Sequence, residues 1–259
     1  MRLIKLLRAM FNQGLRTVEG YQNITLVDTI IAKNIDYQNS LRTQDLPELS
    51  QQANQTFSAI NLLIPEKDLY RVLDFGGGGG HHFAEAQTMF PDKKFRWHVI
   101  ETEEMVEAAR KNIHKQELEF HSTIEKVKNH QLDLVFCNSA LQYTDKPLET
   151  LQSLISLRPN FLYLTRIPLT YGGSFSYTQK SKIMDNGPGS SVQSKSIIKY
   201  KCHVEDFSKF RQTLAREFNI LAIFKESGWD NLPPERMVNS FTIVAILKEI
   251  VNSTIPSGN

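Results

Sequence analysis

The sequence predicts a doubly wound α/β fold with a mostly parallel sheet, and two observations carry this prediction. From Leu69 onward, apolar runs alternate with segments of helical periodicity, as a parallel sheet covered by helices on both faces requires. The first of these runs, residues 71–75, leads directly into five consecutive glycines at residues 76–80. Glycine has no side chain and tolerates positive φ, so such a turn lets a ligand lie against the backbone. We therefore expect a nucleotide-type cofactor beyond the carboxyl ends of the strands.

Each apolar run predicts a strand and each amphipathic interval predicts a helix. The expected strands span residues 71–75, 95–100, 117–120, 132–137, 160–165, 218–225 and 240–247. The expected helices span residues 82–89, 103–112, 147–157 and 204–217, with a short one near 124–129. Residues 168–203 are rich in Gly, Ser, Pro and aromatic residues, so we expect a long excursion with a hairpin there.

The segment before this pattern, residues 1–68, reads as helices and loops without a strand. We expect a helical N-terminal extension that caps the main domain at 69–250, and a frayed tail at 251–259. Basic residues interrupt the apolar start MRLIKLLRAMF, which therefore predicts no membrane span and a cytoplasmic protein. A basic amphipathic helix touching an anionic membrane stays an alternative, although packing on the domain is favoured.

The composition indicates a globular protein rather than a disordered chain. Of 259 residues, 41% are hydrophobic and 22% are charged, which suffices for one large domain with additions. The two cysteines, Cys137 and Cys202, have neither CxxC nor Cys/His spacing. No Asp/Asn metal triad is recognisable either, so we expect no metal.

The spacing of the glycines separates two cofactor classes. A dinucleotide site needs G-x-G-x-x-G, but the third glycine position is His81 in one frame and His82 in the other. The pattern that fits is acidic-x-G-x-G-x-G, at Asp74, Gly76, Gly78 and Gly80. This spacing favours S-adenosylmethionine (SAM) over NAD.

Two further motifs complete a resemblance. Residues 95–101 form a strand that ends in Glu101, and the helix after it begins at Thr102 and is rich in Ala and Arg. In residues 132–143 a polar Asn/Ser pair follows a buried strand. With the glycine turn, these motifs resemble class I SAM-dependent methyltransferases over roughly residues 70–165. The resemblance implies a Rossmann-like, seven-stranded methyltransferase sheet, SAM as the cofactor and methyl transfer (EC 2.1.1) as the activity.

The same resemblance implies the residues that hold the cofactor. Glu101 is expected to accept hydrogen bonds from the ribose hydroxyls. The family often has an acid after the third strand that contacts the adenine, and here Ser122 stands as the substitute. The full implied set is Asp74, Gly76, Gly78, Gly80, Glu101, Thr102, Ser122, Asn138 and Ser139.

Methyl transfer needs alignment of the acceptor and, where the acceptor is a hydroxyl, a general base. The candidates are His81 and His82 in the first turn of a helix, Tyr143 at the cleft, and His203 if the excursion folds back. For each of them, capping or packing is the alternative interpretation.

The expected acceptor site lies on the side of the excursion. Its candidate residues are Gln142, Arg166, Tyr171 and Tyr177. Between Pro168 and His203 five lysines, among them Lys180, Lys182 and Lys195, face a single acid, which suits an anionic acceptor. Solvated surface lysines are the equally weighted alternative.

These observations favour a SAM-dependent methyltransferase acting on a small molecule or sugar, with oxygen as the expected site of methylation. The layout also resembles bacterial methyltransferases associated with surface-polysaccharide assembly, which makes a glycan hydroxyl the first acceptor to test. A non-catalytic SAM-fold binding module is the alternative from another class. Nucleic-acid methylation is disfavoured by a net charge of only +2 and by the absence of an Asn/Asp-Pro-Pro-aromatic motif.

Overall fold

The computed structural model describes residues 17–44, 48–49, 53–62, 67–189, 196–228, 232 and 234–250. The basic N-terminal segment and the tail after residue 250, both subjects of predictions above, lie outside the described residues. Within the described part, none of the helices is both long and apolar enough to cross a bilayer.

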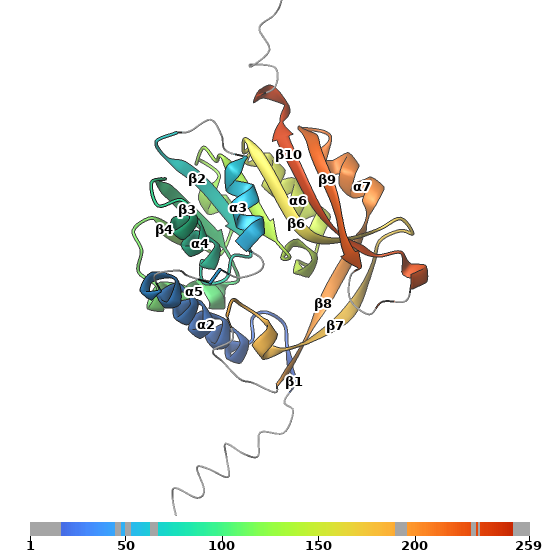
Figure 1. Ribbon diagram of the computed structural model, residues 1–259. Helices are drawn as coiled ribbons and strands as arrows, with labels where there is room; N and C mark the ends of the chain where they lie inside the picture. The colour runs from blue at the N-terminus through green and yellow to red at the C-terminus, as the bar shows by residue number, and fades with distance from the viewer. Residues whose placement is uncertain are drawn as a thin grey trace, which may run out of the picture.

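The centre of the molecule is a sheet in the order β4-β3-β2-β5-β6-β10-β9 (Figure 1). The first five strands are parallel to one another, and β10 is antiparallel to both of its neighbours. The bounds are β2 (Tyr70–Phe75), β3 (Phe95–Ile100), β4 (Leu118–His121), β5 (Leu134–Asn138), β6 (Phe161–Thr170), β9 (Phe218–Gly228) and β10 (Asn239–Leu247). This arrangement confirms the predicted doubly wound, mostly parallel sheet.

Both faces of the sheet are covered, because alternate residues of the parallel strands enter two separate cores. Val72 belongs to one core and its neighbour Leu73 to the other. The first core is packed by α2 (Ile24–Thr43), α3 (Ala53–Asn61), α4 (His81–Met89) and α5 (Glu103–Asn112). The second is packed by α6 (Pro147–Ser156) and α7 (Phe207–Leu214). Four short 3-10 turns complete the described elements: η1 (Ile124–Val127), η2 (Leu141–Tyr143), η3 (Ile183–Asp185) and η4 (Pro234–Arg236).

The expected excursion is a hairpin of β7 (Phe175–Lys182) and β8 (Ile197–Asp206) that projects beyond the carboxyl ends of the central strands (Figure 1). Two sequence expectations are wrong at this hairpin. A strand does precede residue 69, because β1 (Thr17–Glu19) pairs in parallel with the free edge of β8. The last expected helix begins at Phe207 instead of residue 204, because the preceding residues continue β8 and Asp206 caps the helix.

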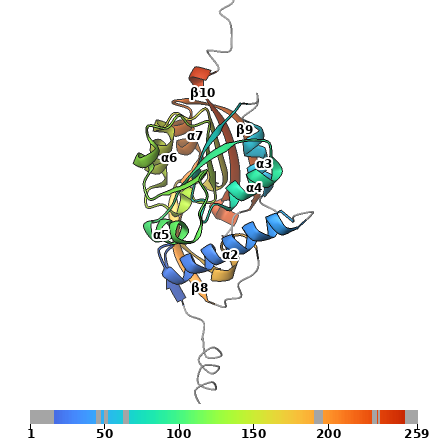
Figure 2. The same cartoon turned by 90° about the vertical axis from the view of Figure 1, so that its left-hand side faces the viewer.

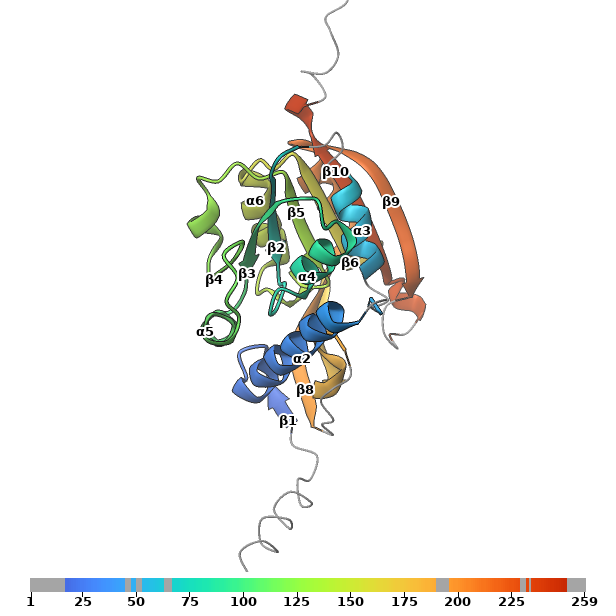
Figure 3. The ribbon, with the colours of Figure 1, turned by 60° about the vertical axis from the view of Figure 1, so that its left-hand side comes forward.

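Helix α2 lies across the carboxyl ends of the central strands, between the hairpin and the glycine turn (Figures 2 and 3). Its buried Lys33 donates from Nζ to the carbonyl oxygens of Met184 at 2.6 Å, Asn186 at 2.7 Å and Gly187 at 3.2 Å. On the same helix, Gln38 Nε2 donates to the carbonyl oxygen of Gly79 at 3.0 Å. The helix therefore fastens the end of the hairpin to the glycine turn.

Candidate active site

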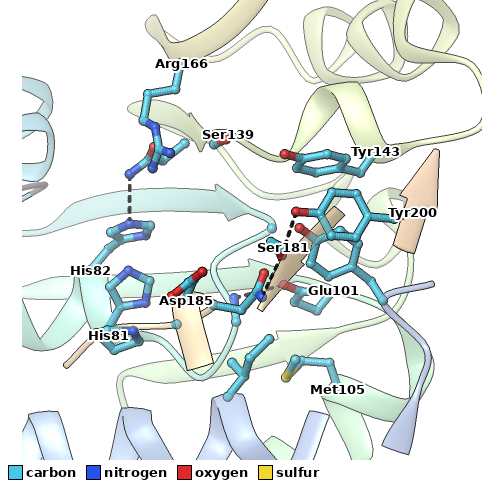
Figure 4. A pocket seen from close by; sticks show the side chains of 18 of the residues that line it. His81, His82, Glu101, Met105, Ser139, Tyr143, Arg166, Ser181, Asp185 and Tyr200 are labelled. Atoms are coloured by element: carbon cyan, nitrogen blue, oxygen red, sulfur yellow. Dashed lines mark hydrogen bonds between the residues drawn. The ribbon is translucent and has the colours of Figure 1, made fainter. Parts of the chain in front are cut away.

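A cavity of about 520 Å³ lies between the glycine turn, α2 and the hairpin. In Figure 4, His81 and His82 stand on one side of it and Tyr143 and Tyr200 on the other. The lining residues are Tyr21, Ile30, Asn34, Gly76, Gly78, His81, His82, Glu101, Met105, Asn138, Ser139, Tyr143, Arg166, Gln179, Ser181, Asp185, Asn186, Gly187, Pro188, Tyr200, Glu226 and Ser240. Its volume is in the range of small-molecule and cofactor sites.

The glycine turn needs glycine for two reasons, conformation and space. Gly76, Gly78 and Gly80 have φ values of 76°, 54° and 78°, which L-residues with side chains rarely adopt. A Cβ atom at Gly76 would lie 2.1 Å from the Cβ of Ala140. Gly76 and Gly78 line the cavity, whereas Gly80 precedes α4 and packs against Leu118.

Glu101 follows β3 and closes the turn from the neighbouring strand. Its Oε1 accepts from the backbone N–H of Gly78 and its Oε2 from that of Thr102, both at 3.0 Å. Burial raises the pKa of Glu101, and these two backbone donors only partly offset that shift. Each carboxylate oxygen keeps a second acceptor position for a ligand. Thr102 itself caps α5 by accepting from the N–H of Met105 and does not line the cavity.

Asp74 is fully buried behind the turn and does not line the cavity. Its Oδ2 accepts from Trp97 Nε1 at 3.2 Å and lies 2.9 Å from Nδ1 of His82. On the other side of the ring, Asn138 Nδ2 lies 3.4 Å from His82 Nε2. Burial opposes the charge on His82, but the carboxylates of Asp74 and Glu85 outweigh it and raise the pKa of His82. Asp74 thus reaches the cavity only through His82.

Three buried polar atoms on the cavity lining have no hydrogen-bond partner among the described residues. They are Asn34 Oδ1, His81 Nδ1 and Asn138 Oδ1. Burial, reinforced by neighbouring His82, holds the pKa of His81 well below its usual value. Because buried polar groups are nearly always paired, these atoms indicate a polar ligand in the cavity.

The residue after β5 and a residue in the middle of β6 have an unusual conformation. Ser139 and Arg166 both have φ of 55°, and such strained backbone concentrates at functional sites. Ser139 Oγ accepts from Nε2 of Gln142, which is buried behind it and does not line the cavity. Among the described lining residues, Arg166 is the sole lysine or arginine.

A group of three tyrosines forms the wall opposite the histidines. The ring centroids of Tyr21, Tyr143 and Tyr200 are 4.9–5.1 Å apart. Tyr143 donates from its hydroxyl to Gln179 Oε1 at 3.0 Å, and Tyr200 donates to Ser181 Oγ at 3.1 Å. Burial raises the pKa of Tyr143 well above its ordinary value, so its hydroxyl stays protonated and is a poor base.

Glu226 adds a carboxylate from β9. Its oxygens accept from the hydroxyls of Ser240 at 2.6 Å, Thr242 at 2.5 Å and Thr165 at 3.4 Å. The sequence analysis missed Glu226 and Ser240, and nothing local distinguishes them from other strand residues. It also missed Asn34, for which a signal exists: polar side chains at helical spacing on the apolar face of α2.

Several predicted residues lie outside the cavity lining. Ser122 is exposed, Tyr171 is 57% exposed and packs against Phe207, and neither Tyr177 nor His203 lines the cavity. Lys180 and Lys182 are exposed, on the face of β7 opposite to the cavity-lining Gln179 and Ser181. The structure therefore contradicts a role for these two lysines in the cavity. Lys195 lies outside the described residues.

Comparison with solved structures finds similar chains at low identity. A SAM-dependent methyltransferase from Clostridium acetobutylicum is 13% identical, with 82% of this chain and 96% of that chain covered and a TM-score of 0.49. Human N-acetylserotonin methyltransferase is 14% identical, with 84% and 57% covered and a TM-score of 0.46. The glycopeptide N-methyltransferase MtfA is 10% identical, with 76% and 95% covered and a TM-score of 0.47. No curated protein sequence matches this chain.

The sequence itself gives the family. The model of the methyltransferase domain family matches residues 37–231, which include the glycine turn, Glu101 and the whole hairpin of β7 and β8. The match confirms the predicted class and its cofactor, SAM. This chain belongs to the methyltransferase domain family.

Proposed function

We propose that this protein transfers the methyl group of SAM to a hydroxyl group of a small molecule or sugar, with His82 as the general base. The observation that carries this proposal is the position of His82, between the buried carboxylate of Asp74 and the cavity. SAM supplies a methyl group that its sulfonium already activates. The protein then has to align the acceptor and remove its proton.

The polar groups of the cavity fit SAM. A Cβ at Gly78 would point toward Ile30 and Asn34 of the cavity lining, so glycine leaves the backbone open there, and the free acceptor positions of Glu101 suit the ribose hydroxyls. The unpartnered oxygen of Asn138 suits the ammonium of the methionine part. Met105 lines the cavity whereas Ser122 does not, so we assign the adenine contact to Met105 in place of Ser122.

The arrangement around His82 is that of a positioned base. When Nδ1–H donates to Asp74, the lone pair of Nε2 points to the side of Asn138 and the cavity. With SAM bound, the methyl group would pass from sulfur to the acceptor oxygen and the sulfur would leave as a neutral thioether. Nε2 of His82 would take the proton of the acceptor hydroxyl, and the buried carboxylate of Asp74 would stabilise the resulting imidazolium. A base in this position accelerates transfer by about 10²–10⁴-fold.

The opposite wall supports a sugar or similar polyol as acceptor. The tyrosine rings, tilted against one another, offer an apolar face, and elsewhere on the lining Ser181, Asp185 and Glu226 offer hydroxyl and carboxylate groups for hydrogen bonds. An anionic group on the acceptor would pair with Arg166 rather than with the hairpin lysines. A precursor of a surface polysaccharide, methylated in the cytoplasm, is the acceptor that we propose to test first.

The test is transfer of labelled methyl from SAM to a panel of sugars, nucleotide-linked sugars and phenols, with the demethylated cofactor measured by mass spectrometry. Residues on alternate faces of β7 supply a matched pair of variants. Gln179→Ala should raise the acceptor KM, because Gln179 lines the cavity, whereas Lys180→Ala should leave it unchanged. SAM binding without turnover on any acceptor would instead support a non-catalytic module. A higher KM in Lys180→Ala would contradict the proposed acceptor site.

A further inference from the structure

A second group of titratable side chains lies away from the cavity, on the neighbouring strands β3 and β4. His98 pairs in register with Glu119, and Ile100 with His121. Since side chains two residues apart share a face of a sheet, His98, Glu119 and His121 point to the same side. The potential ligand atoms of all three lie within 4.8 Å of one another.

The distances within this group have the dimensions of a metal site. His98 Nδ1 lies 3.2 Å from His121 Nε2, and Glu119 Oε2 lies 3.7 Å from the first nitrogen and 3.6 Å from the second. A tetrahedral cation with bonds of about 2.0–2.1 Å holds its ligand atoms about 3.3–3.4 Å apart. An octahedral cation with the same bond lengths would hold neighbouring ligands about 2.8–3.0 Å apart. The observed triangle matches the tetrahedral case better.

We propose that His98 Nδ1, His121 Nε2 and Glu119 Oε2 bind a zinc ion. Two imidazoles and one carboxylate form a donor set that zinc accepts. The Glu119 side chain is 39% exposed and, with His121, lines a surface cavity of about 570 Å³. The fourth coordination position is therefore open to water, and the ion has a route to the site.

The contacts around the group support a cation at its centre. A hydrogen bond between the two rings explains the 3.2 Å contact, but it leaves Glu119 Oε2 beyond hydrogen-bond distance of both. A zinc ion would bridge all three atoms. The other carboxylate oxygen, Oε1, accepts from Arg96 Nη1 at 2.8 Å, which fixes the orientation of Glu119 as partners of metal ligands commonly do.

Zinc at this position would brace the edge of the sheet next to the cofactor. The carbonyl oxygen of His121 accepts from the backbone N–H of Glu101 at 3.0 Å. The ion would join β3 to β4 through His98, Glu119 and His121, next to this hydrogen bond, and binding to the folded chain alone raises its stability. The role is structural, so this inference does not depend on the acceptor or on turnover.

The experiment uses the full chain without an affinity tag, freed of metal by a chelator and titrated with Zn²⁺ by calorimetry. We expect one equivalent per chain, a higher Tm with zinc, and intense visible absorption of tetrahedral character when Co²⁺ is used instead. His121→Ala and Glu119→Gln should each weaken zinc binding at least about tenfold. His114→Ala is the matched control, because this exposed histidine lines the same surface cavity outside the group, and it should bind zinc as the wild type does.

Two outcomes would overturn the proposal. One is the absence of saturable binding near one equivalent. The other is equal zinc affinity in the wild type, His121→Ala and Glu119→Gln. His98 is fully buried and its replacement could unfold the chain, so the test rests on the two more exposed ligands, with circular dichroism to verify that each variant is folded.

Discussion

Replacing Glu101 is the most direct test of the cofactor site. Its two carboxylate oxygens each hold one backbone N–H and each keep one acceptor position for a ribose hydroxyl. A hydrogen bond to a charged group contributes about 1.5–3 kcal/mol, so Glu101→Ala should weaken SAM binding by about 10- to 150-fold. Glu101→Gln keeps one acceptor oxygen and removes a buried charge, so its loss should lie near the lower end of that range.

Calorimetry with SAM and with its demethylated product measures both variants. Glu103→Ala is the control, because it removes an exposed carboxylate two residues away on α5. The freed N–H groups of Gly78 and Thr102 can bind water in the space that the shorter side chain leaves, so Tm should change little. Unchanged affinity in a folded Glu101→Ala variant would refute the assignment of the ribose to Glu101. An equal loss in Glu103→Ala would show a general charge effect instead.

Three further predictions follow from the contacts of single residues. Because the folded-state pKa of His82 is raised, its pairing with Asp74 stabilises the protein fully below the unfolded-state pKa of about 6.5, and this contribution is lost as pH rises through the folded-state value. The turnover rate should rise as pH rises through the folded-state pKa of His82, because the base then loses its proton. His82→Gln should lower the turnover rate by about 10²–10⁴-fold. A turnover rate that rises only below pH 6.5 would exclude His82 as the base. Lys33→Met removes the donor to three backbone carbonyls and should lower the unfolding free energy in urea by about 1–3 kcal/mol, and an unchanged midpoint would contradict the fastening role of α2. Gly76→Ala should lower the free energy of unfolding by about 1–3 kcal/mol more than Gly173→Ala. Both glycines have positive φ, but only a side chain at Gly76 would clash, with Ala140. Equal losses of unfolding free energy in the two variants would mean that Ala140 moves aside.

The sequence alone determined the sheet and the cofactor edge, because both follow from local patterns. Alternating apolar and amphipathic segments require parallel strands with covered faces, and the carboxyl ends of such strands meet at one edge. Gly76, Gly78, Glu101, Asn138 and Ser139 each lie at or just after the end of a strand, and all five line one cavity. Their proximity could be predicted without any knowledge of distant contacts.

The tertiary structure alone decided which face of each element meets the cavity. In β7 the side chains alternate, so a shift of one residue in register would exchange Lys180 for Gln179, and the pairing with β8 fixes that register. Likewise the sequence placed Asp74 with the cofactor, but packing turned its side chain toward His82 and Trp97.

The residues that sequence reasoning missed come from segments far apart in the chain. Asn34 of α2 and Glu226 of β9 reach the cavity through helix docking and strand order, and His98 meets His121 through the register of β3 and β4. Contacts between residues so far apart in the sequence depend on long-range packing, whereas motifs and periodicity indicate only the conformation of neighbouring residues. The cofactor edge can thus be predicted from the sequence, while the proposed base, the proposed acceptor wall and the proposed zinc ligands are positioned by the fold.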